Sequence, residues 1–306
     1  MKKLTNSFLL LLTALIWGIA FLAQSVGMDY VGAFTFNGVR SFIGGIVLIP
    51  CIFVINKIKA KSGDKQNRDK KNVIIGGVIC GTLLFVASSL QQIGLMYTSP
   101  GKAGFITALY IILVPVAGIF LGRRPGIKLA FAAVGALIGL YFLCFTGDSF
   151  TLELGDLLIF LCAIVFTAHI LVIDRFSPKV DGVLMSCIQF FVCAALSFVP
   201  MMIFEEPTMS AIFAAKIPIL YAGVMSCGVA YTLQIVGQKG VNPTLASLIL
   251  SLESCFALLG EFVYLKLTGA ESFMSAREIS GCVIVFASII LAQLPDFKKN
   301  KKESAH

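Results

Sequence analysis

Apolar blocks of about twenty residues recur from one end of this chain to the other, and they constrain its fold more than any other feature. The hydrocarbon core of a bilayer is about 30 Å thick, so a helix needs roughly 20 residues to cross it. Hydrophobic residues make up 58% of the 306 positions and charged residues only 13%, too few to coat a water-soluble fold of this size. We therefore expect a polytopic membrane protein.

Long apolar runs between charged or Gly/Pro/Asn breaks predict ten membrane-spanning helices. Backbone groups cannot stay unpaired in lipid, so the expected fold class is all-α. The expected spans are residues 8–26, 33–55, 73–97, 103–122, 127–147, 154–173, 183–204, 213–236, 244–267 and 277–294.

The distribution of Lys and Arg predicts how the chain is oriented. Of the 24 Lys and Arg residues, 19 fall in segments on one side of the membrane if the N-terminus is inside. Cytoplasmic segments are enriched in these residues, so we expect both termini in the cytoplasm and the chain in the cytoplasmic (inner) membrane. The same bias explains the net charge of +8. A nucleic-acid partner is not expected, since that would need a basic folded domain and the sequence shows none. The expected partners are a small-molecule substrate and the lipid bilayer, with a monomer or homodimer as the assembly.

The chain also repeats itself weakly, with an offset of about 143 residues. The matches are Leu90-Gln91 and Gly94 with Leu233-Gln234 and Gly237, Pro100 and Ala103 with Pro243 and Ala246, and, after a three-residue gap, Gly77-Val78 with Gly223-Val224. Each half holds five spans, an odd number, so the second half enters the membrane from the opposite side. We therefore expect two inverted five-helix repeats, 1–147 and 148–294, followed by a cytoplasmic tail, 295–306. Such repeats build secondary transporters; duplication for stability alone is the alternative.

Short motifs carry a resemblance to a known family over nearly the whole chain. They are Ala14-Leu15-Ile16-Trp17-Gly18, Phe36-Asn37-Gly38-Val39-Arg40, residues 97–106, residues 109–115, Ala246-Ser247-Leu248 and Ser251-Leu252-Glu253. With these motifs the chain resembles the drug/metabolite transporter superfamily, in particular its EamA-type branch with two five-span domains. That family often has Glu-Pro in the ninth span, whereas Ser254 follows Glu253 here. The carboxyl group is retained, but the sequence does not predict the kink that a proline would supply.

Glu253 is the sharpest candidate for function, because an ionisable group near the bilayer midplane is costly. It lies about ten residues into the ninth expected span, with no basic neighbour in sequence. A carboxyl group at that depth suits proton coupling or the binding of an amine. The alternative is a protonated structural Glu that is hydrogen-bonded to a neighbouring helix.

Arg40 and Gln91 lie at similar depth in the second and third expected spans, and Asn37 shares the motif of Arg40. A guanidinium group there can hold a substrate carboxylate through two parallel hydrogen bonds. Arg40 could instead fix helix packing or extend toward the interface, and the packing role is favoured on sequence alone. His169 lies near the inner end of the sixth expected span, which favours an interfacial role.

Further candidates are polar or aromatic residues within spans. Trp17 and Gln24 share one face of the first span with Thr13 and Ala20. The family resemblance implies that the fourth and eighth spans surround a central cavity, which adds Tyr110, Tyr231 and Gln234. For each of these residues, hydrogen bonding or packing between helices is the alternative to lining a cavity.

Together these features favour a secondary transporter for small polar metabolites that works by alternating access. The EamA-type resemblance implies export of amino acids or their derivatives. No Walker A motif, HExxH pair or Cys-x-x-Cys spacing is visible, so we expect no enzyme activity, catalytic residue, metal or cofactor. The alternatives are uptake or exchange, as in other branches of the superfamily, and, less favoured, a passive channel or a lipid-handling protein.

Overall fold

The computed structural model describes residues 2–61, 69–98, 100–123, 126–144, 153–267, 269 and 274–294. Helices make up all the regular secondary structure of these residues. The expected tail, 295–306, and the expected boundary between the halves, 147/148, lie outside the described residues.

Each half of the chain contributes five spans, and some spans consist of more than one helix. The first half holds α1 (Lys2–Met28), α2 (Ala33–Lys61), α3 (Lys70–Gly94), α4 (Pro100–Ala108) with α5 (Tyr110–Phe120), and α6 (Ile127–Cys144). The second half holds α7 (Leu154–Phe176), α8 (Gly182–Phe204), the short α9 (Met209–Ala214), α10 (Lys216–Leu220) with the π-helix η1 (Tyr221–Tyr231) and α11 (Thr232–Gly237), α12 (Pro243–Leu250) with α13 (Leu252–Leu267), and α14 (Ala276–Gln293). Nine of the described helical segments are long and apolar enough to cross a membrane, and α6 is a shorter apolar helix. The expected all-α, ten-span fold is confirmed.

The ends of several spans differ from the prediction. α1 begins at Lys2 and α2 continues to Lys61, because a helix can extend past the apolar run that reveals it. α3 instead ends at Gly94, three residues early, where the next residues turn back onto the carbonyls of Gln91, Ile93 and Gly94.

Two spans are interrupted near their middle, which the hydropathy pattern does not predict. The fourth span breaks at Leu109, between α4 and α5, and the ninth breaks at Ser251, between α12 and α13. The second interruption occurs without a proline. The Ser251 hydroxyl donates to the carbonyl of Leu248, and the Ser247 hydroxyl to that of Thr244. Serine hydroxyls that bond back in this way compete with the helix ladder and bend it.

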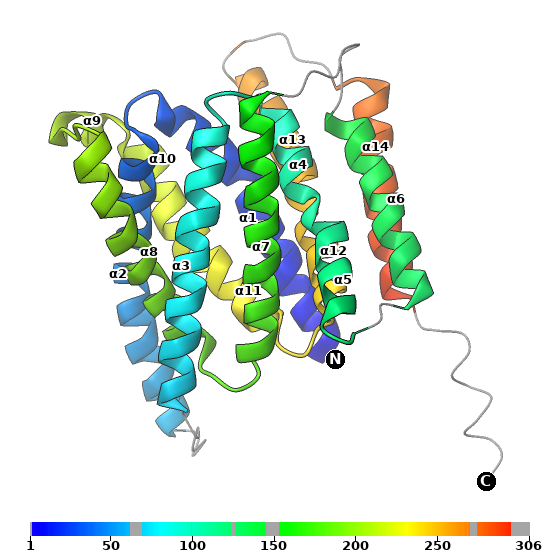
Figure 1. The fold of residues 1–306 in the computed structure, drawn as a ribbon, viewed down its shortest axis with the longest axis horizontal. Helices are drawn as coiled ribbons and strands as arrows, with labels where there is room; N and C mark the ends of the chain where they lie inside the picture. The colour runs from blue at the N-terminus through cyan, green and yellow to red at the C-terminus, as the bar shows by residue number, and fades with distance from the viewer. Residues whose placement is uncertain are drawn as a thin grey trace.

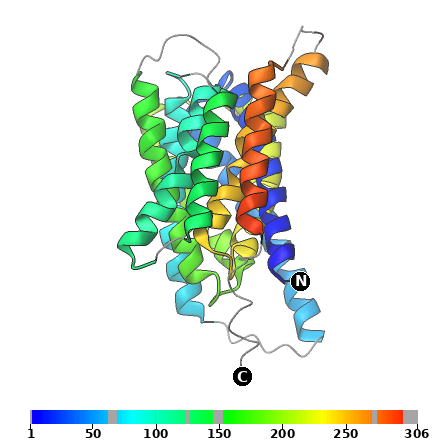
Figure 2. The same ribbon diagram turned by 90° about the vertical axis from the view of Figure 1, so that its right-hand side faces the viewer.

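The two halves have opposite topology. α1 begins and α14 ends at the bottom of the bundle in Figure 1, which we call the lower side, and the opposite end is the upper side. α7 begins at the upper side, so the second half crosses in the reverse sense. The bundle viewed from its right-hand side has α6 and α14 in front (Figure 2).

Contacts between helices are repeated across the two halves. α2 packs against α8, and α6 against α14, so helices in equivalent positions meet. α1 packs against α13 and α11, just as α7 packs against α5 and α3. This mirrored pattern is that of an inverted repeat.

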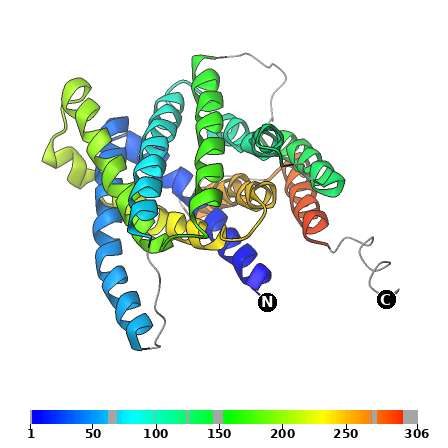
Figure 3. The ribbon, with the colours of Figure 1, turned by 60° about the horizontal axis from the view of Figure 1, so that its bottom comes forward.

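Two glycines make equivalent close contacts in the two halves. A Cβ on Gly94 of α3 would lie 3.2 Å from the carbonyl oxygen of Gly155 and 2.7 Å from Ile159. A Cβ on Gly237 of α11 would lie 3.1 Å from the carbonyl oxygen of Asn6 and 3.3 Å from Leu10. Figure 3 shows α11, in yellow, beside the first turns of α1, in dark blue. Gly94 therefore corresponds to Gly237 and α7 to α1, with Gly155 in the place of Asn6 and Ile159 in that of Leu10.

A second pair of glycines shows where the repeats differ. A Cβ on Gly81 would meet the carbonyl oxygen of Gln189 at 2.6 Å and Val192 at 2.7 Å. A Cβ on Gly223 would meet the carbonyl oxygen of Arg40 at 3.1 Å and Ile43 at 2.8 Å. Gly223 therefore corresponds to Gly81, which corrects the gapped match to Gly77. The stretch from Gly223 to Gly237 is one residue longer than that from Gly81 to Gly94, and it contains most of η1.

Polar contacts join the halves at each side of the bundle. On the upper side Glu205, after α8, accepts hydrogen bonds from the backbone N–H groups of Phe34 (2.8 Å) and Thr35 (2.7 Å) at the start of α2. A carboxylate is stabilised there because the first N–H groups of a helix have no intrahelical partner. On the lower side Arg123 forms an ion pair with Asp174.

Candidate functional site

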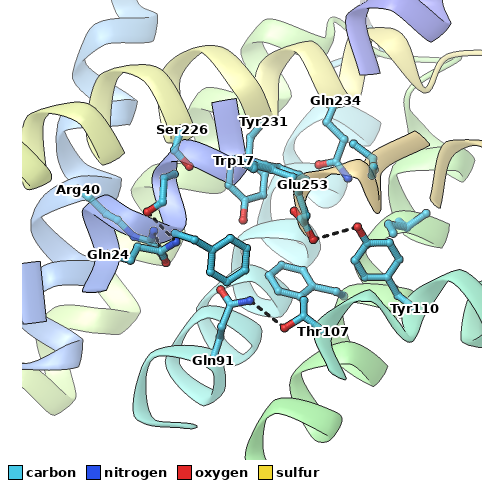
Figure 4. A pocket seen from close by; sticks show the side chains of 15 residues that line it. Trp17, Gln24, Arg40, Gln91, Thr107, Tyr110, Ser226, Tyr231, Gln234 and Glu253 are labelled. Carbon is cyan, nitrogen blue, oxygen red and sulfur yellow. Dashed lines mark hydrogen bonds between the residues drawn. The ribbon is translucent and has the colours of Figure 1, made fainter. Parts of the chain in front are cut away.

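A pocket lies between the two halves, and helices from both of them form its walls (Figure 4). About 510 Å³ of space lies between its side chains and at its mouth. The lining residues are Trp17, Ala20, Phe21, Gln24, Arg40, Gln91, Thr107, Tyr110, Phe166, Ile170, Ser226, Tyr231, Gln234, Leu250 and Glu253.

At one end of the pocket, Glu253 and Tyr110 form a hydrogen bond across the two halves. The Tyr110 hydroxyl donates to Oε1 of Glu253 at 3.0 Å, and both residues are buried. Tyr110 lies just after the break at Leu109, and Glu253 lies just after the break at Ser251. The two residues are 143 positions apart, which is the repeat offset. The bond therefore joins equivalent positions, at the axis that relates the halves.

At the other end of the pocket lies Arg40 (Figure 4). Its Nη1 donates to Oε1 of Gln24 at 2.9 Å, and its guanidinium carbon lies 5.4 Å from the centre of the Phe36 ring. Nε of Arg40 is buried and has no hydrogen-bond partner within the described part of the chain. Arg40 thus retains an unused donor at the pocket, which an anionic group could accept.

Aromatic side chains form the wall between these two ends. The rings of Trp17 and Tyr231 lie 4.5 Å apart, and Phe21 and Phe166 add further apolar surface. The indole N–H of Trp17 is buried, and no described residue accepts its hydrogen bond. The wall is therefore mainly apolar, and it contains a buried indole donor without a partner among the described residues.

Two amide side chains stand at equivalent positions of the halves. Nε2 of Gln91 donates to the Thr107 hydroxyl at 3.2 Å. Gln234, its repeat equivalent, is buried, and its Oε1 has no partner among the described residues. The pocket thus offers a free amide oxygen on the side of the second half.

Much of the pocket consists of repeat-related pairs. With α7 aligned on α1 through Ile159 and Leu10, Phe166 takes the place of Trp17, and Ile170 that of Phe21. The offset that relates Tyr110 to Glu253 also relates Gln91 to Gln234 and Thr107 to Leu250. The pocket therefore includes the axis between the repeats.

The structure brings eight of the nine candidate residues together. Trp17, Gln24, Arg40, Gln91, Tyr110, Tyr231, Gln234 and Glu253 all line the pocket. Asn37 does not: it is fully buried in α2, and its side-chain amide has no partner among the described residues. Thr13, which shares a helical face with Trp17, also lies outside the pocket and donates to the carbonyls of Leu9 and Ala230.

Other residues differ from the sequence-based expectation. His169 does not reach the surface of the bundle: it is fully buried, and its Nε2 lies 2.9 Å from Oε1 of Gln189. Phe166, Thr107 and Ser226 line the pocket but were not among the candidates. A repeat alignment that included α1 and α7 would have found Phe166, as the counterpart of Trp17.

A helical membrane protein built from two inverted five-helix repeats, with a polar pocket on the axis between them, has the architecture of a membrane transporter. The chain belongs to the EamA-like transporter family, whose model matches residues 5–145 and again 153–294. The resemblance seen in the sequence motifs is confirmed.

Known relatives agree with this assignment. The chain is 29% identical over 298 residues to an uncharacterized transporter of Archaeoglobus fulgidus, covering 95% of this chain and 87% of the relative. It is 24% identical over 250 residues to the uncharacterized transporter YoaV of Bacillus subtilis, covering 80% of this chain and 83% of the relative. A protein of known crystal structure shares the fold with a TM-score of 0.74 at 20% identity, covering 94% of this chain and 96% of that chain.

Proposed function

We propose that this protein is a secondary transporter that exports small zwitterionic metabolites, such as amino acids or their derivatives, across the cytoplasmic membrane. One observation carries the proposal: a single pocket between the two halves holds a carboxyl group, Glu253, at one end and a guanidinium group, Arg40, at the other. These are the complementary charges for a solute with an amine and a carboxylate.

Each end of the pocket has a definite task in this proposal. Glu253 accepts hydrogen bonds from the amine of the solute or exchanges a proton in its place, while Tyr110 holds the carboxyl group in position. Arg40 donates its unused N–H to the carboxylate of the solute, an interaction strengthened by charge. Trp17 and Tyr231 pack against the apolar part of the solute.

Alternating access follows from the inverted repeat. Two similar halves of opposite topology can exchange conformations, which closes the pocket to one side and opens it to the other. The Lys- and Arg-rich segments support a lower side that faces the cytoplasm, with both termini there. Export is then the movement of solute from the lower to the upper side.

The first experiment is untargeted metabolomics of spent medium from bacteria that overproduce the protein, compared with the Glu253→Gln variant. Glu206→Gln is the matched control, because Glu206 is an exposed carboxylate outside the pocket. We expect a class of amine-bearing metabolites to accumulate with the intact protein and the control variant but not with Glu253→Gln, at equal amounts in the membrane.

Two results would contradict the proposal. If the medium is unchanged although membrane expression is verified, export is wrong and uptake or exchange must be measured in vesicles. If Glu253→Gln exports as well as the intact protein, the role given to this carboxyl group is wrong. Phosphorylated or nucleotide-linked solutes are less favoured, because Arg40 is the only cation among the described residues that line the pocket.

A further inference from the structure

A second buried polar pair, His169 and Gln189, lies behind the wall of the pocket and is not used in the proposed function. The two side chains join α7 to α8 through the 2.9 Å contact between His169 Nε2 and Gln189 Oε1. The His169 ring also lies 6.1 Å from that of Tyr231, which lines the pocket. Both residues are fully buried, but neither is part of the lining.

Each member of this pair has an unused polar atom. Because the Oε1 of Gln189 is an acceptor, Nε2 of His169 is the donor, and its Nδ1 is left as a hydrogen-bond acceptor. Neither Nδ1 of His169 nor the side-chain nitrogen of Gln189 has a partner among the described residues. A buried polar group without a partner is destabilising, so a state of the protein that satisfies both atoms would be favoured.

The repeat gives this pair a counterpart at the pocket. The carbonyl of Gln189 meets Gly81 in the way that the carbonyl of Arg40 meets Gly223, so Gln189 occupies the place of Arg40. The alignment of α7 on α1 puts His169 in the place of Ala20. Arg40 and Ala20 both line the pocket in this structure, whereas Gln189 and His169 do not.

The pocket is therefore displaced toward one side of the membrane. Arg40 lies near the upper end of α2, and Gln189 lies near the lower end of α8. Arg40 and Ala20, the upper members of the two pairs, line the pocket. Gln189 and His169, the lower members, are buried outside it.

We propose that His169 and Gln189 form the solute contact of the opposite state, in which the pocket opens to the lower side. When the halves exchange conformations, these residues take the places of Ala20 and Arg40. Nδ1 of His169 then accepts a hydrogen bond from the solute, and the amide of Gln189 donates one. The site suits a solute group that both donates and accepts, such as an amide or a carboxyl group with a neighbouring amine. This inference rests on the alternating access of the proposed function.

The test is the side from which engineered cysteines react. The nine native cysteines are first replaced, and Ala20→Cys and His169→Cys are then made singly. Leu10→Cys and Ile159→Cys are matched controls, because this second repeat-related pair is fully buried and packs against close-contact glycines in both halves. A membrane-impermeant thiol reagent is applied to right-side-out and inside-out vesicles.

We expect His169→Cys to react from the lower side, and Ala20→Cys from the upper side, each at least ten-fold faster than its control. The inference is overturned if His169→Cys is as inert as Ile159→Cys, or if it reacts from the same side as Ala20→Cys. His169 and His306 are the only two histidines. Modification of unsubstituted His169 by diethyl pyrocarbonate, read by mass spectrometry, therefore gives a second measurement if the cysteine variant does not fold. This reagent crosses membranes, so it reads only whether His169 becomes accessible: modification of His169 supports the inference, and an unmodified His169 overturns it.

Transport by the cysteine-free protein with His169 intact, measured in matching vesicles, separates this inference from the proposed function. Transport that continues where His169→Cys is inert overturns the inference and leaves the proposed function in place. If no solute moves although His169→Cys reacts from the lower side, the transport proposal is wrong, while the exchange of the pocket is supported.

Discussion

A tight approach of backbone to backbone between the halves on the upper side is made by Gly155, the second residue of α7, and it yields a quantitative prediction. A Cβ at this position would lie 2.6 Å from the carbonyl oxygen of Gly94, 2.7 Å from the carbonyl carbon of Tyr97 and 2.9 Å from the amide nitrogen of Thr98. All three are backbone atoms, so no side-chain rotation can relieve the overlap. Gly155→Ala must therefore push α7 away from the end of α3.

The expected cost has two parts. Overpacking of a close contact costs about 1–3 kcal/mol. The displacement also strains the 2.7 Å hydrogen bond that the Thr98 hydroxyl donates to Asp156, and a bond to a charged group contributes about 1.5–3 kcal/mol. If part of this bond is lost, the total is about 2–5 kcal/mol. At about 2–4 °C per kcal/mol for a domain of this order of size, the melting temperature should fall by roughly 4–20 °C.

The assay is the fraction of detergent-solubilised protein that remains monodisperse after heating, read by size-exclusion chromatography. Gly126→Ala is the control, because no atom lies within 4 Å of the Cβ it would add and its φ is not positive. If Gly155→Ala and Gly126→Ala melt at the same temperature, the close approach of α3 and α7 is wrong.

Three further predictions follow from single contacts. Glu205→Gln should lower the melting temperature by several degrees, because its two oxygens accept from different N–H groups and an amide nitrogen cannot replace either; exposed Glu206→Gln, heated in parallel, should not. Tyr110→Phe should slow transport in proteoliposomes roughly ten-fold, since it removes a hydrogen bond of about 1–1.5 kcal/mol to Glu253, and an unchanged rate would argue against that contact. Arg123→Ala should cost no more than about 1 kcal/mol of stability, and so lower the melting temperature only slightly, because the Arg123 side chain is 53% exposed. A large loss of stability would show that the ion pair acts as a buried one.

The number of spans and their reversed order could be predicted from the sequence, because the cost of unpaired backbone in lipid leaves few alternatives. Eight of the nine candidate residues could be placed at the pocket for a related reason: polar side chains within spans seldom face lipid. The same argument does not distinguish Asn37, which is buried in the bundle but outside the pocket. A polar residue that faces another helix and one that faces a pocket carry the same signal in a single sequence.

The interruptions at Leu109 and Ser251 could not be read from hydropathy, because a broken helix is as apolar as a continuous one. They bear on the site, since Tyr110 is the first residue after Leu109 and Glu253 the second after Ser251. Phe166 and Ile170 were missed because apolar pocket residues look like core residues until the repeat assigns them counterparts in Trp17 and Phe21.

The eighth span contains one residue that the equivalent stretch of α3 lacks, and η1 accommodates it. An added residue in an α-helix would lengthen it by about 1.5 Å and turn everything beyond it by about 100°. Gly223 and Gly237 nevertheless keep the contacts of their counterparts at both ends of the stretch, because the wider π-helical turn absorbs the added residue. Tyr231 lies between these two fixed points. Sliding of the π-turn along the stretch would therefore rotate the Tyr231 ring about the helix axis while both ends stay anchored, a degree of freedom that the first half of the chain lacks.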